Sequence, residues 1–110
     1  MTEPRSILLL GSTGSIGTQA LDVVRTNPHL FTITGLAAGG HSRRSIDLLC
    51  DQIAEFGVTE VAVADADAAQ IVQDRTGISV RVGESAATDL VNTVPAHTAV
   101  SYTHLRAHET

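Results

Sequence analysis

Three glycines and several hydroxyl residues lie close together near the start of the chain, in the order Gly11-Ser12-Thr13-Gly14-Ser15-Ile16-Gly17. An apolar run at 7–10 precedes them and an amphipathic stretch follows. A strand, a glycine turn and a helix in that order can bind phosphate, because the N–H groups of the first helical turn are unpaired and carry partial positive charge. Gly11 would allow a tight turn, and Gly14 would admit a pyrophosphate without a Cβ in its way. We therefore predict a nucleotide-binding turn, with a purely structural turn as the alternative.

The remaining residues of this stretch add detail to the prediction. Gly17, one turn into the expected helix, would let that helix lie close to the sheet. The hydroxyls of Ser12, Thr13 and Ser15 would add donors to the same concavity. The spacing is Gly-x-x-Gly-x-x-Gly, which differs from the commonest NAD fingerprint, Gly-x-Gly-x-x-Gly.

The residues that follow the second expected strand indicate which cofactor would bind. NAD-specific folds place a carboxylate roughly 20 residues after the glycines, where it holds the ribose diol. Here that position is occupied by Gly39 and Gly40, and the first carboxylate after them is Asp47. His41 and the arginines at 43–44 come directly after the glycines, and guanidinium groups bind phosphate well. We expect an adenosine 2′-phosphate near Gly39, Gly40, His41 and Arg43, so NADP rather than NAD, with His41 either stacking on the adenine or touching the phosphate. The alternative is that the arginines merely lie on an exposed helical turn and His41 is an ordinary loop residue.

Hydrophobic periodicity predicts strands that alternate with helices. The expected strands are 5–10, 31–38, 60–64 and 78–82, and the expected helices are 15–27, 42–57 and 67–77, with a short helix or turn at 84–91. Such alternation predicts a parallel sheet with right-handed crossovers. The expected fold class is α/β, an incomplete Rossmann-like doubly wound parallel sheet.

Individual positions within these helices have expected roles. In the first helix, the stripe facing the sheet is predicted to be Ile16, Ala20, Val23 and Val24. In the second helix, the predicted buried stripe is Ile46, Leu49, Cys50, Ile53 and Phe56, which makes Cys50 a core residue rather than a reactive thiol. Asp67 with Gln70 has the form of a capping box at the start of the third helix. Asp65 and Asp67 lie where such sheets bind ligands, but helix capping is the preferred interpretation.

Composition excludes several classes of protein. The chain has 110 residues, 43% hydrophobic and 17% charged, with a formal net charge of −5, which suits a compact domain with no nucleic-acid or acidic-membrane surface. No apolar run approaches the roughly 20 residues that span a bilayer. The first strand is expected so close to Met1 that a signal peptide has no room, and the single cysteine excludes an internal disulfide. A cytoplasmic location is expected.

The string Gly-Ser-Thr-Gly-Ser-Ile-Gly at 11–17, with Gln19-Ala20-Leu21-Asp22-Val23-Val24-Arg25 and Asn27-Pro28 after it, closely resembles one family. That family is 1-deoxy-D-xylulose 5-phosphate reductoisomerase. The runs at 35–40 and 58–65 are similar to it as well, and the resemblance covers residues 5–91.

The resemblance implies several properties. Thr13, Gly14, Ser15 and Ile16 would contact the pyrophosphate and nicotinamide side of NADPH, and Gly39, Gly40 and His41 would fall near the 2′-phosphate. The family isomerises 1-deoxy-D-xylulose 5-phosphate and reduces the product with NADPH to 2-C-methyl-D-erythritol 4-phosphate, in isoprenoid biosynthesis. It uses Mg²⁺ or Mn²⁺ and is expected to be a homodimer. The catalytic, metal-binding and substrate-binding parts of the family lie beyond this chain, so no catalytic or metal residue is assigned here.

Residues 1–100 are therefore expected to form a partial NADP-binding domain, and 101–110 to be an unrelated tail, such as cloning or sequencing-adaptor sequence. A metal site at His104 and His108, with His97, is the alternative interpretation of that tail. For the whole chain two alternatives stay open. One is another NADP-dependent enzyme, such as a short-chain reductase or a semialdehyde dehydrogenase, and the other is a nucleotide-binding module without catalysis.

Overall fold

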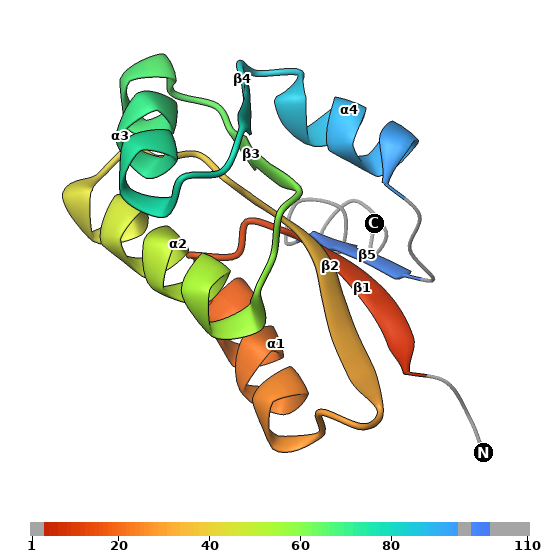
Figure 1. Ribbon diagram of the computed structural model, residues 1–110. Coiled ribbons are helices and arrows are strands. Elements are labelled where there is room, and N and C mark those ends of the chain that lie inside the picture. Colours follow the sequence, from red (N-terminus) through yellow and green to blue (C-terminus); the bar gives the residue numbers. More distant parts are fainter. Residues whose placement is uncertain (1–3, 95–97, 102–110) are drawn as a thin grey trace.

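Five parallel strands form the centre of the molecule. The computed structural model describes residues 4–94 and 98–101 (Figure 1). The strands are β1 (Arg5–Leu10), β2 (Phe31–Ala38), β3 (Val61–Val63), β4 (Val80–Val82) and β5 (Thr98–Ser101). They lie in the order β4-β3-β2-β1-β5, and each neighbouring pair is parallel. The predicted α/β class and parallel sheet are confirmed, and β5 is a strand that the sequence analysis did not predict.

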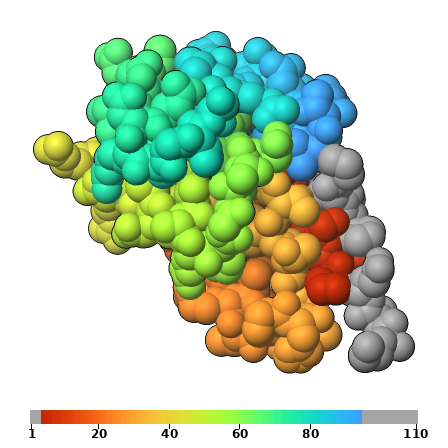
Figure 2. All heavy atoms as spheres, viewed as in Figure 1, coloured from red at the N-terminus to blue at the C-terminus, as the bar shows by residue number. Residues whose placement is uncertain are grey.

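Helices cover both faces of this sheet. The four helices of the described chain are α1 (Ser15–Thr26), α2 (Arg43–Phe56), α3 (Ala66–Thr76) and α4 (Ala86–Thr93). The first three pack on one face, in a core that includes Leu9, Leu21 and Leu49. Helix α4 packs on the other face, where Leu8 and Leu90 belong to a smaller core. Figure 1 shows the two layers, and Figure 2 shows α1, α2 and α3 side by side over the viewed face. The doubly wound arrangement is therefore confirmed.

The sequence of β1 accounts for its central place. Successive side chains of a strand point to opposite faces, so a strand covered on both faces must be apolar throughout. Leu8 and Leu9 are both 1% exposed, one in each core. The pairing with β2 contains one irregularity, because Ile7 lies opposite Ile33 but Leu8 lies opposite Gly35. Regular pairing resumes after it, with Leu10 opposite Ala37, so β1 and β2 stay paired up to the glycine turn (residues 11–14).

The helix ends follow local signals, with one correction. Helix α1 ends at Thr26 before the Asn27-Pro28 pair, and α2 ends before Gly57, which has the left-handed conformation (φ +63°) that favours glycine. The capping box predicted at Asp67 was wrong. Helix α3 begins earlier, and the carboxylate of Asp65 caps it by accepting a hydrogen bond from the Ala68 N–H at 2.9 Å. Asp65 lies two residues after the end of β3, at the N-cap position, so the helix capping expected for Asp65 is confirmed.

The predicted inward stripe of α1 was also partly wrong. Its buried residues are Gly17, Leu21 and Val24, whereas Ile16 is 37% exposed and Val23 52% exposed. Ala20 and Val24 do pack in the larger core. Periodicity alone leaves open which of two neighbouring rows faces inward. Gly17 determines which row faces inward. The helix approaches the backbone of the preceding turn at Gly17, so the row that contains Gly17, Leu21 and Val24 faces the protein interior.

Helix α2 follows the predicted stripe closely. Leu49, Cys50 and Ile53 are buried, and Ile46 and Phe56 pack against the same core while partly exposed. Burial raises the pKa of the Cys50 thiol, so this cysteine is a core residue with little thiolate. Gln52 is a buried polar residue that the pattern did not predict.

The described C-terminal part bears on the expected domain boundary. Ser101, the first residue of the expected tail, is the last residue of β5 and lies opposite Leu10 of β1. The rest of the tail, 102–110, with His104 and His108, lies outside the described residues, as does His97. Among the described residues, no helix is long and apolar enough to cross a membrane.

We predict that Gly17→Ala destabilises the fold. A Cβ at this position would lie 2.2 Å from the Gly11 carbonyl oxygen and 2.7 Å from Ser12 Cα, and backbone atoms cannot move away cheaply. The expected loss is about 1–3 kcal/mol, as for other overpacked sites, measured by urea unfolding. Gly14→Ala is the matched control, because its Cβ would meet only the Gly11 carbonyl oxygen, at 3.5 Å. Equal unfolding midpoints for the two variants would contradict this account of Gly17.

Candidate functional site

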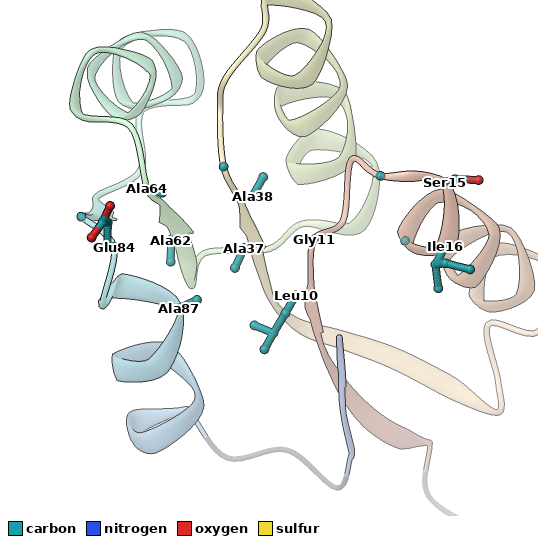
Figure 3. A pocket seen from close by; sticks show the side chains of 14 residues that line it. Leu10, Gly11, Ser15, Ile16, Ala37, Ala38, Ala62, Ala64, Glu84 and Ala87 are labelled. Atoms are coloured by element: carbon teal, nitrogen blue, oxygen red, sulfur yellow. The ribbon is translucent and has the colours of Figure 1, made fainter. Parts of the chain in front are cut away.

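A cleft of about 750 Å³ runs across the carboxyl ends of the strands. It extends from Ile16 at the start of α1 to Glu84 in the loop between β4 and α4 (Figure 3). Its lining consists of Leu10, Gly11, Gly14, Ser15, Ile16, Gly17, Ala37, Ala38, Gly39, Ala62, Ala64, Gly83, Glu84 and Ala87. Parallel sheets of this kind bind ligands at the carboxyl ends of their strands, next to the point where the strand order reverses. In this sheet that point is between β1 and β5, and the cleft begins beside it, at the end of β1.

Backbone hydrogen bonds hold the glycine turn in place. The N–H groups of Gly11 and Ser12 both donate to the Ala37 carbonyl of β2, at 2.7 and 3.0 Å. Gly11 has φ +75°, a left-handed conformation that favours glycine. The Gly14 N–H donates to the Gly11 carbonyl at 3.1 Å, which closes the turn. The chain therefore leaves β1 through a tight turn, as predicted for Gly11.

Gly14 and Gly17 differ in what their missing side chains avoid. A Cβ at Gly17 would collide with the backbone of the turn, so this glycine is required for packing. Gly14 has φ −80° and ψ 175°, an extended conformation open to any residue, and it is exposed. A Cβ there would make only an ordinary contact at 3.5 Å. Packing therefore requires glycine at 17 but not at 14.

The start of α1 presents unneutralised backbone donors to the cleft. Gly14 is its N-cap, no side chain caps the helix, and its first turn holds no acidic residue. Ser15 and Ile16 are exposed and line the cleft. The first N–H groups of a helix have no partner within it and carry its positive dipole end, so this position can bind an anion.

The other hydroxyl residues of the turn lie behind it, toward α2. The expectation that the Ser12 hydroxyl adds to the concavity was wrong, because Ser12 is fully buried. Its carbonyl accepts a hydrogen bond from Gln52 Nε2 of α2 at 2.9 Å. Thr13 is half-buried and does not line the cleft, and its hydroxyl is 2.8 Å from that of Ser45 in the first turn of α2. These contacts join the glycine turn to α2.

The residues after β2 surround the neighbouring part of the site. Gly39 lines the cleft, and the imidazole of His41 lies so close to it that a Cβ at Gly39 would come within 2.6 Å of the ring. Gly40 is buried with φ +77°, and a Cβ there would meet the Ala68 side chain at 2.6 Å. Gly40 thus serves the packing of α3, and His41 is exposed beside the cleft rather than in its lining.

Arg43 and Arg44 begin α2. Both are exposed, and neither forms an ion pair within the described residues, whereas Arg25, Arg75 and Arg81 each pair with a carboxylate. Cations at a helix N-terminus are disfavoured by the helix dipole, so folding of this helix does not account for them. The Thr13–Ser45 contact brings this turn of α2 next to the glycine turn. The two predicted parts of the site are therefore neighbours in the fold, although Arg43 does not line the cleft.

Sequence reasoning missed the far side of the cleft. Ala62 and Ala64 from β3 and its end, Gly83 and Glu84 from the loop after β4, and Ala87 of α4 all line it. Their position in the sequence could have identified them, because Ala62 and Ala64 lie at the end of β3 and Gly83 and Glu84 directly follow β4. The run of small residues was interpreted only as strand sequence.

Metal-binding side chains do not gather in the described part of the chain. Within residues 4–94 and 98–101, no group of three or more His, Cys, Asp or Glu side chains could hold a metal ion. The alternative metal site at His104 and His108 falls outside those residues.

Comparison with known proteins gives concordant matches. The family model of 1-deoxy-D-xylulose 5-phosphate reductoisomerase matches residues 7–104. The chain is 54% identical over 93 residues to the reductoisomerase of that name from Rhodococcus jostii, a match that covers 84% of this chain and 22% of the relative. It is 44% identical over 99 residues to the one from Corynebacterium glutamicum, covering 88% of this chain and 24% of the relative. The chain thus spans less than a quarter of the length of these relatives.

Solved structures share the fold. A DOX-P reductoisomerase in complex with magnesium superposes with a TM-score of 0.76 at 20% identity, covering 87% of this chain and 24% of that one. The Zymomonas mobilis enzyme in complex with NADPH gives a TM-score of 0.71 at 22% identity, covering 83% of this chain and 24% of that one. The family model matches most of the chain, and the strands and helices follow the same architecture. The chain belongs to the 1-deoxy-D-xylulose 5-phosphate reductoisomerase family.

Proposed function

We propose that this chain is the NADPH-binding part of a 1-deoxy-D-xylulose 5-phosphate reductoisomerase. The observation that carries the proposal is Gly14, an exposed glycine that packing does not require, next to the uncapped start of α1. A bare backbone at this position lets a pyrophosphate approach the first helical N–H groups. Ser15 and Ile16 lie beside it in the cleft lining. The solved Zymomonas mobilis relative was determined in complex with NADPH.

The end of β2 supports NADPH over NADH. Gly39 lines the cleft there, and no carboxylate occupies the place where one would hold a ribose diol. Arg43 and Arg44 lie close by on an exposed helical turn without carboxylate partners among the described residues. A 2′-phosphate near Gly39, Gly40, His41 and Arg43 would offset the positive charge of the two arginines. It would also offset the positive end of the α2 dipole.

Thr13 has a supporting place in this proposal. Its hydroxyl bonds to Ser45 of α2. It would orient the glycine turn toward the cofactor through its backbone, with the side chain bound to α2.

The whole protein would carry out the family's reaction, and this chain would contribute cofactor binding to it. NADPH supplies the hydride for the reduction of the isomerised sugar phosphate. One solved relative was determined in complex with magnesium, and another in complex with NADPH, fosmidomycin and magnesium. Substrate binding, a divalent metal, a homodimer and a cytoplasmic location are proposed for the whole protein on the strength of family membership.

We predict that Gly14→Val abolishes NADPH binding while leaving the fold intact. The branched side chain would occupy the space of the pyrophosphate, and the backbone conformation (φ −80°) accepts any residue. The dissociation constant should rise by at least about 100-fold, measured by isothermal titration calorimetry, while the variant still unfolds cooperatively, with at most the small loss of stability expected for valine at an N-cap. Ser79→Val, at the opposite edge of the sheet, should bind NADPH normally. Retained affinity in Gly14→Val would show that the ligand lies elsewhere.

We also predict that Arg43→Ala weakens NADPH binding about tenfold and leaves NADH binding nearly unchanged, because a charge-assisted hydrogen bond to the 2′-phosphate would be lost. Arg5→Ala removes the same charge at the start of β1, at the opposite edge of the sheet, and should change neither affinity. Titrations with both coenzymes test this. An equal loss for NADPH and NADH would remove Arg43 from the 2′-phosphate site.

A further inference from the structure

The two ends of the cleft differ in chemistry. The end at Gly14 and Ser15 offers backbone donors at the start of a helix. The other end is lined by Ala62, Ala64 and Ala87, whose small apolar side chains form a surface suited to the face of a planar ring (Figure 3). The cleft therefore has a polar, anion-binding end and an apolar end.

Glu84 is the one charged side chain among the residues that line this cleft. The backbone beside Glu84 is anchored, since the Gly83 N–H donates to the Val63 carbonyl of β3 at 3.1 Å, and the Glu84 side chain itself is exposed. Figure 3 shows the Glu84 carboxylate at the apolar end, near Ala62 and Ala64. Within the described residues, this carboxylate has no ion pair and no hydrogen bond. It is thus an unpartnered hydrogen-bond acceptor at the edge of an apolar surface.

The proposed cofactor position brings one part of the ligand to this end. With the pyrophosphate at the start of α1 and the 2′-phosphate near Gly39, the ribose that carries it lies over the end of β2. The base attached to that ribose then extends past β3, toward the loop between β4 and α4. This placement of the base rests on the proposed function, since the base next to the 2′-phosphate of NADPH is adenine.

We propose that Glu84 recognises the exocyclic amino group of adenine and so makes the site selective for 6-amino purines. A carboxylate can only accept hydrogen bonds, and the amino group of adenine donates. Hypoxanthine carries a carbonyl oxygen at the same position, and its lone pairs would face the carboxylate. Discrimination against such a base follows because a charged group without its partner loses a charge-assisted hydrogen bond.

The test compares NADPH with reduced nicotinamide hypoxanthine dinucleotide phosphate, in which a carbonyl oxygen replaces the amino group at C6 and N1 carries a hydrogen. By isothermal titration calorimetry, the unaltered 110-residue chain should bind NADPH about tenfold more tightly than the hypoxanthine coenzyme. In Glu84→Gln the difference should fall to within about twofold, because the amide can both accept and donate. Asp89→Asn, which removes a charge from α4 outside the cleft lining, should keep the full preference.

Equal affinities of the unaltered chain for the two coenzymes, or an undiminished preference in Glu84→Gln, would overturn this inference while leaving the proposed function standing. Failure of the unaltered chain to bind either coenzyme would instead overturn the proposed function and the assignment of Glu84 with it.

Discussion

The close approach of α1 to the backbone of the glycine turn is the constraint on which the site depends. Helix α1 can begin where it does only because Gly17 carries no Cβ, since one would lie 2.2 Å from the Gly11 carbonyl oxygen. That approach fixes the rotation of the helix, which buries Leu21 and leaves Ile16 at the cleft. It also directs the first N–H groups of α1 at the carboxyl edge of the sheet, where an anion can reach them.

A second set of contacts makes the site a single unit. The Ser12 carbonyl is bound by Gln52, and the Thr13 hydroxyl by Ser45, so the turn after β1 is attached to α2. Two segments more than thirty residues apart in the sequence thereby lie together: the turn that would hold the pyrophosphate and the helical turn that carries Arg43. A cofactor that needs both an uncharged phosphate-binding turn and a nearby cation would find them prearranged, which lowers the cost of ordering them on binding.

The glycines of this chain differ in whether the packing of the fold requires them. Gly17 and Gly40 are enforced by neighbouring atoms, and Gly11 by its left-handed backbone. Gly14 is enforced by neither, and it is therefore the glycine that carries the proposed binding role. The chain belongs to the reductoisomerase family and spans 22% of the length of the first of its relatives.

The sequence by itself determined the order of the elements from β1 to α4, the parallel sheet and the glycine turn. These follow from local periodicity and from residues such as Gly57 and Asn27 that act on their own backbone. The tertiary structure alone decided which row of α1 faces inward and that Ser12 is buried beneath the turn. It also decided that Ala62, Ala64 and Glu84 complete the cleft. These outcomes depend on contacts between segments distant in the sequence, and a pattern within one segment carries no information about its distant neighbours.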